Sequence, residues 1–395
     1  MNKLPTITGQ IASRMNDIQP FHVMDLLARA KQLEAQGQSI IHLEIGEPDF
    51  ATADPIIAAG QTALQNKLTH YTAALGLPEL RQAISDYYQQ QFSVNVPASR
   101  IAITPGASGA LHLALAVLLN PGDGMLMADP GYPCNRHFVR LLEAQAQIVP
   151  VDDKTGFQLN AELIEQNWNQ QTIAAMVATP SNPTGTIISR NEMQAMINAV
   201  QLKSGTLLVD EIYQGLVYDS ENYTALSISQ DVFVINSFSK YFGMTGWRLG
   251  WMVVPEQYMA AIDRLAQNIF LAPATLSQHA ALAAFSDESL SIQNQRRDEF
   301  KKRRDYLLPA LRSLGFEIKA EPQGAFYLYA NCSRFTDDSY KFVYQLLEQT
   351  GVAITPGIDF GSNKAEQYCR FAYTRPVEIL EEGVNRLSRF LNVLV

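Results

Sequence analysis

The chain has 395 residues, of which 47% are hydrophobic and 17% charged, so we expect a globular protein with a large core and two or three domains. Its formal net charge of −9 argues against nucleic acid or an anionic membrane as the main partner.

The ends and the cysteines of the sequence predict a cytoplasmic location. Residues 1–20 lack the apolar core of a secretory signal, and no apolar run is long enough to span a bilayer. The three cysteines, Cys134, Cys332 and Cys369, have neither close spacing nor a metal-binding pattern. They are typical of free thiols in a reducing compartment.

The first predicted elements are a helix over residues 20–36, ended by Gly37, and a strand that leads into a turn over residues 39–50. Between residues 100 and 255, short apolar runs alternate with helical segments, as in a mainly parallel sheet flanked by helices. The runs predicted as strands are 101–104, 125–128, 173–178, 207–209, 232–235 and 250–254.

The pattern changes after about residue 284, where a long charged amphipathic helix is predicted to begin a smaller α/β segment. Its "KKRR" run at 301–304 could form a nucleic-acid patch. Because acidic residues surround the run, we favour a solvated helix face.

The loop after the first of these strands suits a phosphate. "PGASGALHLAL" places Gly106, Ala107 and Ser108 at the start of a helix, where N–H groups and the helix dipole favour an anion. Many strand-to-helix turns also need glycine, and the loop matches neither the dinucleotide fingerprint nor the Walker motif. The loop alone therefore leaves both readings open.

Two further loops each allow a structural and a functional interpretation. In "DPGYPCNR", Tyr132 either packs in a surface turn or stacks on a flat ligand ring. In "TPSNPTGT", Asn182 either forms a turn with its own backbone or directs its amide at a ligand oxygen.

The last two strand ends carry charged residues. Asp210, which precedes Tyr213, either forms a salt bridge, caps a helix or faces a cationic ligand nitrogen, because an unpaired buried carboxylate is costly. Lys240 lies among hydroxyls, glycines and aromatics, an environment that can depress the pKa of a lysine and make it a nucleophile. Ser237 and Arg248 can hold a phosphate.

Together these groups form a complete pyridoxal 5'-phosphate site. The phosphate needs a helix N-terminus, a serine and an arginine, and the ring needs a stacking aromatic. The ring nitrogen needs a carboxylate, the phenolic oxygen needs donors, and the aldehyde needs one lysine. Ligands bind at the carboxyl ends of strands in such sheets, which is where all these residues lie.

The sequence resembles the class I/II aminotransferases of fold type I from about residue 15 to its end. The motifs that carry the resemblance, in the family's order, are "GEPDF", "YTAALGLPELR", "GASGALHLAL", "NPGD", "DPGYP", "SNPTGT", "DEIY", "SFSKYFGMTGWRLGW", "PQGAFYLY" and "PGIDFG". The resemblance implies a large cofactor-binding domain and a smaller α/β domain built from both chain ends. We divide the chain into an arm and part of the small domain (1–45), the large domain (46–283) and the small domain (284–395).

The resemblance also implies a role for each matching residue. Lys240 would form the Schiff base and carry the Cα proton, with Asp210 and Tyr213 as the other catalytic residues. Arg370 would bind the substrate α-carboxylate, with help from Gly46 and Asn182. The residues that would hold the cofactor are Gly106, Ala107, Ser108, Tyr132, Asn182, Asp210, Tyr213, Ser237, Lys240, Arg248 and Tyr71. Tyr71 would reach the neighbouring subunit's phosphate, which implies a homodimer.

We therefore predict a ping-pong aminotransferase that acts on an L-amino acid and a 2-oxo acid. Some relatives specific for dicarboxylates carry a lysine where this chain has Ser108, and others use an arginine where this chain has none, between Arg264 and Arg296. This difference favours a neutral or aromatic substrate side chain. A C–S lyase or synthase on the same scaffold is the main alternative, and a cofactor-binding regulator without enzymatic activity is a second one.

Overall fold

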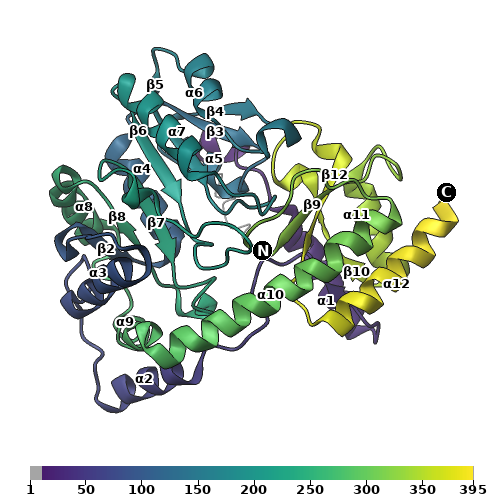
Figure 1. Cartoon of the computed structure of the whole chain (residues 1–395), viewed down its shortest axis with the longest axis horizontal. Coiled ribbons are helices and arrows are strands. Elements are labelled where there is room, and N and C mark those ends of the chain that lie inside the picture. Colours follow the sequence, from purple (N-terminus) through teal and green to yellow (C-terminus); the bar gives the residue numbers. More distant parts are fainter. Residues whose placement is uncertain (1–10, 395) are drawn as a thin grey trace, which may run out of the picture.

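The largest element of the computed structural model, which describes residues 11–394, is a seven-stranded sheet (Figure 1). Its strands lie in the order β2-β8-β7-β6-β5-β3-β4. Their bounds are Ile101–Thr104 (β2), Gly124–Asp129 (β3), Gln145–Pro150 (β4), Thr172–Ala178 (β5), Thr206–Asp210 (β6), Phe233–Ser237 (β7) and Gly250–Val253 (β8). Strand β8 is antiparallel to both of its neighbours, and all other pairs are parallel. The predicted α/β fold with a mainly parallel sheet is confirmed.

Helices cover both faces of this sheet (Figure 1). The helices of the chain are His22–Ala35 (α1), Asp54–Gln65 (α2), Pro78–Phe92 (α3), Gly106–Leu118 (α4), Pro133–Leu141 (α5), Ala161–Asn167 (α6), Arg190–Leu202 (α7), Glu256–Ile269 (α8), Thr275–Leu282 (α9), Asp287–Leu314 (α10), Ser339–Thr350 (α11) and Val377–Leu394 (α12). In β6, Leu208 packs in the core that contains Leu111 of α4. Its neighbours Leu207 and Val209 belong to the core that contains Met196 of α7. Successive side chains of the strand point to opposite faces, and both faces are buried, so its apolar residues are consecutive.

Two smaller sheets lie beside the large one. Their strands are Ile41–His42 (β1), Tyr327–Asn331 (β9), Val352–Ala353 (β10), Thr355–Pro356 (β11) and Tyr368–Ala372 (β12). The parallel pair β1-β10 joins an N-terminal segment to a C-terminal one, and β11-β12-β9 is antiparallel. The domain boundaries at 45 and 283 stay a prediction, and residues 1–10 of the predicted arm lie outside the described residues.

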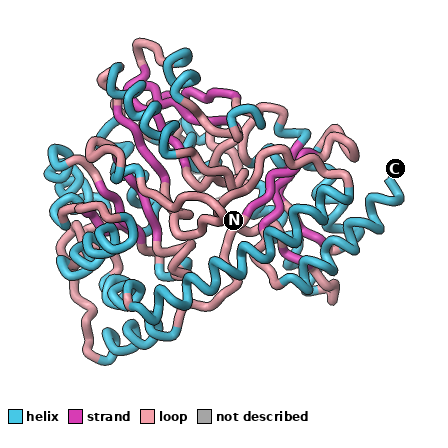
Figure 2. The backbone as a smooth tube through the Cα atoms, in the orientation of Figure 1, coloured by secondary structure: helices cyan, strands magenta, loops and turns pink. Residues whose placement is uncertain are grey.

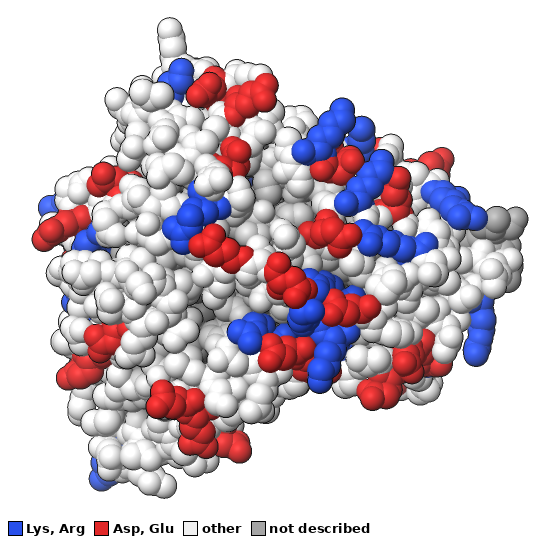
Figure 3. All heavy atoms as spheres, viewed as in Figure 1, with Lys and Arg blue, Asp and Glu red and all other residues white. Residues whose placement is uncertain are grey.

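Helix α10 corrects the interpretation of the "KKRR" run. Lys302 is exposed, but Arg303 and Arg304 are only 2% and 8% exposed, because the helical period turns them inward. Arg303 Nη1 lies 2.8 Å from Asp49 Oδ1, and Arg304 Nη2 lies 2.7 Å from Asp219 Oδ2. The run therefore contains two buried arginines that form ion pairs, and only part of it is a solvated face. Acidic and basic side chains are mixed over this surface (Figure 3).

Loops gather between the large sheet and the smaller ones (Figure 2). Within residues 11–394, no helix is long and apolar enough to cross a bilayer. Cys134, Cys332 and Cys369 are free thiols; Cys332 Sγ donates to Gln367 O at 3.3 Å and Cys369 Sγ to Ala330 O at 3.8 Å.

Candidate active site

Strand ends of the large sheet meet β9 and β12 at a cavity of about 250 Å³. The predicted site residues that line this cavity are Gly46, Ala107, Ser108, Tyr132, Asn182, Asp210, Tyr213, Ser237, Lys240, Arg248 and Arg370. Gly106, at the start of α4, and Tyr71 are the predicted residues outside the lining. The fold therefore brings together residues that are more than 300 positions apart in the sequence, from Gly46 to Arg370.

One end of the cavity carries donors for an anion. Helix α4 begins without a capping side chain, so N–H groups of its first turn have no intrahelical partner. Arg248 lies beside this turn, since a Cβ at Gly106 would come within 2.8 Å of its Nη2. Ser237 Oγ accepts a hydrogen bond from Ser239 N at 3.0 Å, which leaves its hydroxyl proton free to donate. These groups suit a phosphate.

Lys240 projects from the loop after β7 into the cavity. Its Nζ donates a hydrogen bond to Gly46 O at 2.7 Å. Burial lowers the pKa of Lys240 to about 8, while Glu47 opposes that shift and Arg370 reinforces it. A substantial fraction of the amine is therefore neutral near physiological pH, as a nucleophile requires.

Asp210 ends strand β6 with its side chain buried in the cavity wall. Its Oδ1 accepts a hydrogen bond from Ile212 N at 3.1 Å, and burial raises the pKa of Asp210 to about 7. No salt bridge between residues 11 and 394 includes Asp210, so the ion-pair alternative is wrong. A cationic ligand nitrogen would let this carboxyl ionise.

Two polar side chains beside Lys240 are fixed by residues from β9 and β12. The hydroxyls of Tyr213 and Tyr327 lie 2.7 Å apart. Asn182 Oδ1 accepts a hydrogen bond from Arg370 Nη1 at 2.9 Å, so its amide nitrogen stays available as a donor. Tyr327 has no predicted role, although it lies in the "PQGAFYLY" motif. It also explains Gly46, because a Cβ there would lie 1.9 Å from the Tyr327 hydroxyl.

Arg370, on β12, is a buried cation whose contacts are all neutral. Its Nη2 donates to Glu44 O at 2.5 Å and to Thr355 Oγ1 at 3.3 Å, and its Nε has no partner among the described residues. The guanidinium lies 4.3 Å from the ring centre of Tyr327. A buried charge without a counter-ion is costly, so this site is prepared for an anionic ligand group.

The residues present fit pyridoxal phosphate. One cavity is lined by Lys240, Asp210, Arg248 and Arg370. Arg370 Nε has no partner among the described residues, and Arg248 closely approaches Gly106. Tyr132 adds an aromatic ring to the lining, and its stacking on a ligand ring stays a prediction. Within residues 11–394, no group of three or more His, Cys, Asp or Glu residues could hold a metal ion.

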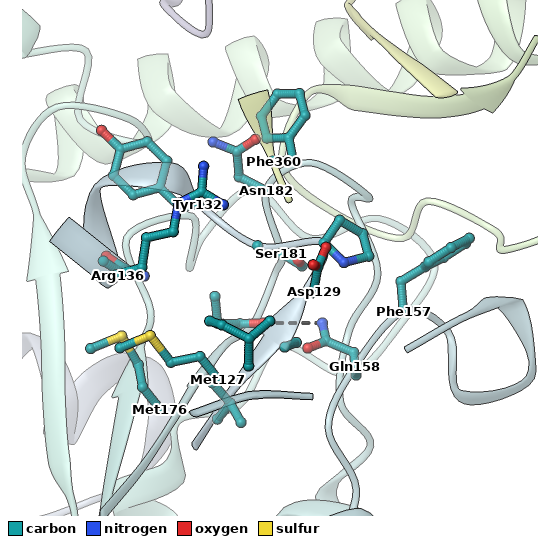
Figure 4. A pocket seen from close by; sticks show the side chains of 17 residues that line it. Met127, Asp129, Tyr132, Arg136, Phe157, Gln158, Met176, Ser181, Asn182 and Phe360 are labelled. Carbon is teal, nitrogen blue, oxygen red and sulfur yellow. Dashed lines mark hydrogen bonds between the residues drawn. The ribbon is translucent and has the colours of Figure 1, made fainter. Parts of the chain in front are cut away.

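A second cavity adjoins the first and shares Tyr132 and Asn182 with it (Figure 4). Its wall is mainly apolar, with Met127, Met176 and Phe360 among the lining residues. Because it contains no lysine, it lacks the nucleophile of the first cavity. The chemistry therefore belongs to the first cavity.

Comparisons with known proteins agree with this arrangement. The family model "Aminotransferase class I and II" matches residues 38–387. The chain belongs to the class I and II aminotransferase family. It is an aminotransferase, and the enzymes of this family generally depend on pyridoxal phosphate and act on amino acids and 2-oxo acids.

Relatives in the family match the chain from end to end. Valine–pyruvate aminotransferase of Mycobacterium tuberculosis is 37% identical over 98% of this chain and 99% of its own length. The (5-formylfuran-3-yl)methyl phosphate transaminase of Methanocaldococcus jannaschii is 37% identical over 97% of this chain and 100% of its own. A crystal structure of an aminotransferase from Mycobacterium tuberculosis superposes with a TM-score of 0.95 at 36% identity, covering 98% of this chain and 100% of that one.

Proposed function

We propose that this aminotransferase uses pyridoxal phosphate, bonded through Lys240, to move an amino group between an L-amino acid with a neutral or aromatic side chain and a 2-oxo acid. The observation that carries the proposal is the placement of Lys240, Asp210 and Arg370 around one cavity. Each supplies a different part of the chemistry: nucleophile, charge partner and carboxylate anchor.

The cofactor would be held at four points. The first turn of α4, Ser237 and Arg248 would bind its phosphate, and Tyr132 would stack on its ring. Asp210 would pair with the ring nitrogen, and Tyr213 and Asn182 would donate to the phenolic oxygen. When bound, the cofactor supplies an aldehyde that takes up the amino group and a ring that withdraws electrons from Cα.

The residues of the chain would then move protons and hold charge. Arg370 would anchor the substrate carboxylate, and the free amine of Lys240 would remove the Cα proton and later return it. The ionised carboxylate of Asp210 would keep the ring nitrogen protonated, and the positive charge of that nitrogen would make removal of the Cα proton possible. The first product, a 2-oxo acid, would leave before the second substrate, another 2-oxo acid, binds, which is a ping-pong order.

Apolar side chains of the N-terminal segment support the proposed substrate class. Phe21, Val23 and Met24 line the cavity, and Leu111 joins them from α4. A relative named as acting on valine and pyruvate is consistent with a neutral side chain. Such a wall would bury an aliphatic or aromatic side chain favourably, and it offers no second cation to a dicarboxylate.

The test is the first half-reaction, followed by absorbance. Pyridoxal phosphate is added to the purified protein, and single amino acids are then supplied without any oxo acid. We expect a visible band that fades as each neutral amino acid reacts, with release of its oxo acid. Release of pyruvate and ammonia from cysteine, with the band retained, would instead establish the lyase alternative. A protein that never gains the band would contradict the proposal.

We also propose a homodimer in which Tyr71 serves the neighbouring site. Tyr71 is 81% exposed and lies outside its own cavity, on a segment with exposed Leu64 and Leu68. Sedimentation equilibrium should give twice the 43.9 kDa chain mass. Tyr71→Ala should weaken cofactor binding without dissociating the dimer. A monomer with full activity would contradict both points.

We also propose a cytosolic location, because the three cysteines are free thiols.

Replacing Arg370 with glutamine should raise the KM of the amino acid and spare the cofactor. Loss of a buried charge partner costs about 2–4 kcal/mol, or roughly 30- to 1000-fold in kcat/KM. The measurement is steady-state kinetics beside a cofactor titration, in which the cofactor dissociation constant should stay within about threefold of wild type.

Arg100→Gln is the matched control for this prediction. Arg100 is also buried and also donates to neutral oxygens, with Nε 2.9 Å from Val254 O, but it precedes β2 at the opposite end of that strand from the cavity. It should lower the thermal midpoint and leave KM unchanged. Equal KM values for the two variants would contradict the role of Arg370.

A further inference from the structure

A buried row of hydrogen bonds lies behind the cavity. Asn236 Nδ2 donates to Gln214 Oε1 at 3.1 Å, and Gln214 Nε2 donates to Glu211 Oε2 at 2.9 Å. All three side chains are at most 4% exposed, and none of them lines the cavity. The mechanism proposed above uses none of these groups.

Both ends of this row are fixed by the backbone. Glu211 Oε1 accepts hydrogen bonds from Ala225 N at 2.7 Å and from Thr224 Oγ1 at 3.2 Å. Asn236 Oδ1 accepts from Ser237 N at 2.7 Å. A buried network whose donors and acceptors are satisfied in this way has one preferred geometry.

The row joins the two strand ends that carry the reacting groups. Glu211 directly follows Asp210 at the end of β6, and its N–H donates to Ile235 O of β7 at 2.8 Å. Asn236 directly precedes Ser237, whose Oγ in turn fixes Ser239 N at 3.0 Å, one residue before Lys240. The row therefore connects the residue that follows Asp210 to the end of the strand that leads into the Lys240 loop.

We propose that Glu211, Gln214 and Asn236 are positioning residues that set the separation between Asp210 and the loop from Ser237 to Lys240. This inference rests on the proposed function, in which one rigid cofactor must meet Asp210, Ser237 and Lys240 at the same time. A misplacement of about 1 Å in such a constellation is expensive, because the bound group cannot stretch to follow it.

The experiment reverses the direction of one hydrogen bond and then restores it. In Glu211→Gln, either orientation of the new amide sets an N–H against another donor, Gln214 Nε2 or Ala225 N. The double variant Glu211→Gln with Gln214→Glu exchanges donor and acceptor and rebuilds the bond between the two side chains, but it loses the bond that Gln214 Nε2 donates to Tyr223 O at 3.1 Å. Gln214→Leu, which removes the row without adding a charge, is the second single variant.

The readouts are the dissociation constant of pyridoxal phosphate, the pH at which the bound cofactor changes its absorption, and the thermal midpoint of the cofactor-free protein. Each single variant should weaken cofactor binding about tenfold, because the displaced groups no longer meet the rigid cofactor together. The double variant should bind the cofactor more tightly than Glu211→Gln alone. The pH at which the bound cofactor changes its absorption should shift in the single variants and return toward the wild-type value in the double variant.

Ser339→Ala is the matched control, because its buried Oγ donates to Ala365 O at 3.1 Å in a region that contributes no residue to the cavity. It should lower the thermal midpoint alone. Single variants that lose thermal stability as this control does, with unchanged cofactor binding and absorption pH, would overturn the inference. A wild-type protein that binds no cofactor would instead overturn the proposed function, so the two failures are distinguishable.

Discussion

Replacing Lys240 with alanine should lower transamination by at least about 10³-fold while the chain still folds. The variant loses both the group that bonds the cofactor and the group that carries the Cα proton, and a positioned proton carrier alone contributes roughly 10²- to 10⁴-fold. Folding should persist because the side chain makes a single hydrogen bond within residues 11–394, to Gly46 O, and because burial already disfavours its charged form.

The measurements are turnover with a neutral amino acid, far-UV circular dichroism and the thermal midpoint. Lys302→Ala is the control, since that lysine is exposed on α10 and its nearest acidic partner, Glu299, is 3.8 Å away. It should match wild type in all three readouts. Turnover of Lys240→Ala within tenfold of wild type would remove Lys240 from the mechanism.

The sequence predicted the buried strands better than the exposed one. Each of the six predicted strands of the large sheet contains at least three consecutive apolar residues, such as Leu207–Val209 in β6. Strand β4, "QAQIVP", was missed because most of its side chains are exposed or half-buried, and four of its residues are polar, proline or alanine. The reversed direction of β8 has no signal in its composition.

Site residues were predictable where a chemical role demands one residue type. Lys240, Asp210 and Arg370 belong to this class, and the fold brings them to one cavity, although their roles stay predictions. Residues that act through a neighbour gave no such signal. Tyr327 and Asn236 look like ordinary strand residues, and only the register of the sheets shows that they support Tyr213 and Ser237.

Replacing Asp210 with asparagine should separate stability from function. Asparagine has nearly the same shape but cannot carry the negative charge that keeps a ring nitrogen protonated, so we expect turnover to fall roughly 10²- to 10⁴-fold. The backbone hydrogen bond from Ile212 N can still be accepted by the amide oxygen. Cofactor should still bind through the phosphate donors and Lys240.

The same substitution should stabilise the cofactor-free protein at high pH. Burial raises the pKa of Asp210 from 3.8 to about 7, so between these values the folded state binds more protons than the unfolded state. Its contribution to the free energy of unfolding therefore falls as pH rises through this window. Asparagine has no such dependence, and the variant should exceed wild type by about 4 kcal/mol at pH 8.

Urea unfolding of the cofactor-free proteins at pH 5 and pH 8 measures this difference. The advantage of the variant should shrink as pH falls toward 5, where the wild-type carboxyl is protonated in the folded state. Glu211, also buried with its pKa raised to about 8, is present in both proteins and largely cancels. A variant that is less stable than wild type at both pH values would mean that Asp210 supports the fold, whereas the predicted pattern marks a carboxyl that is strained until a cationic ligand arrives.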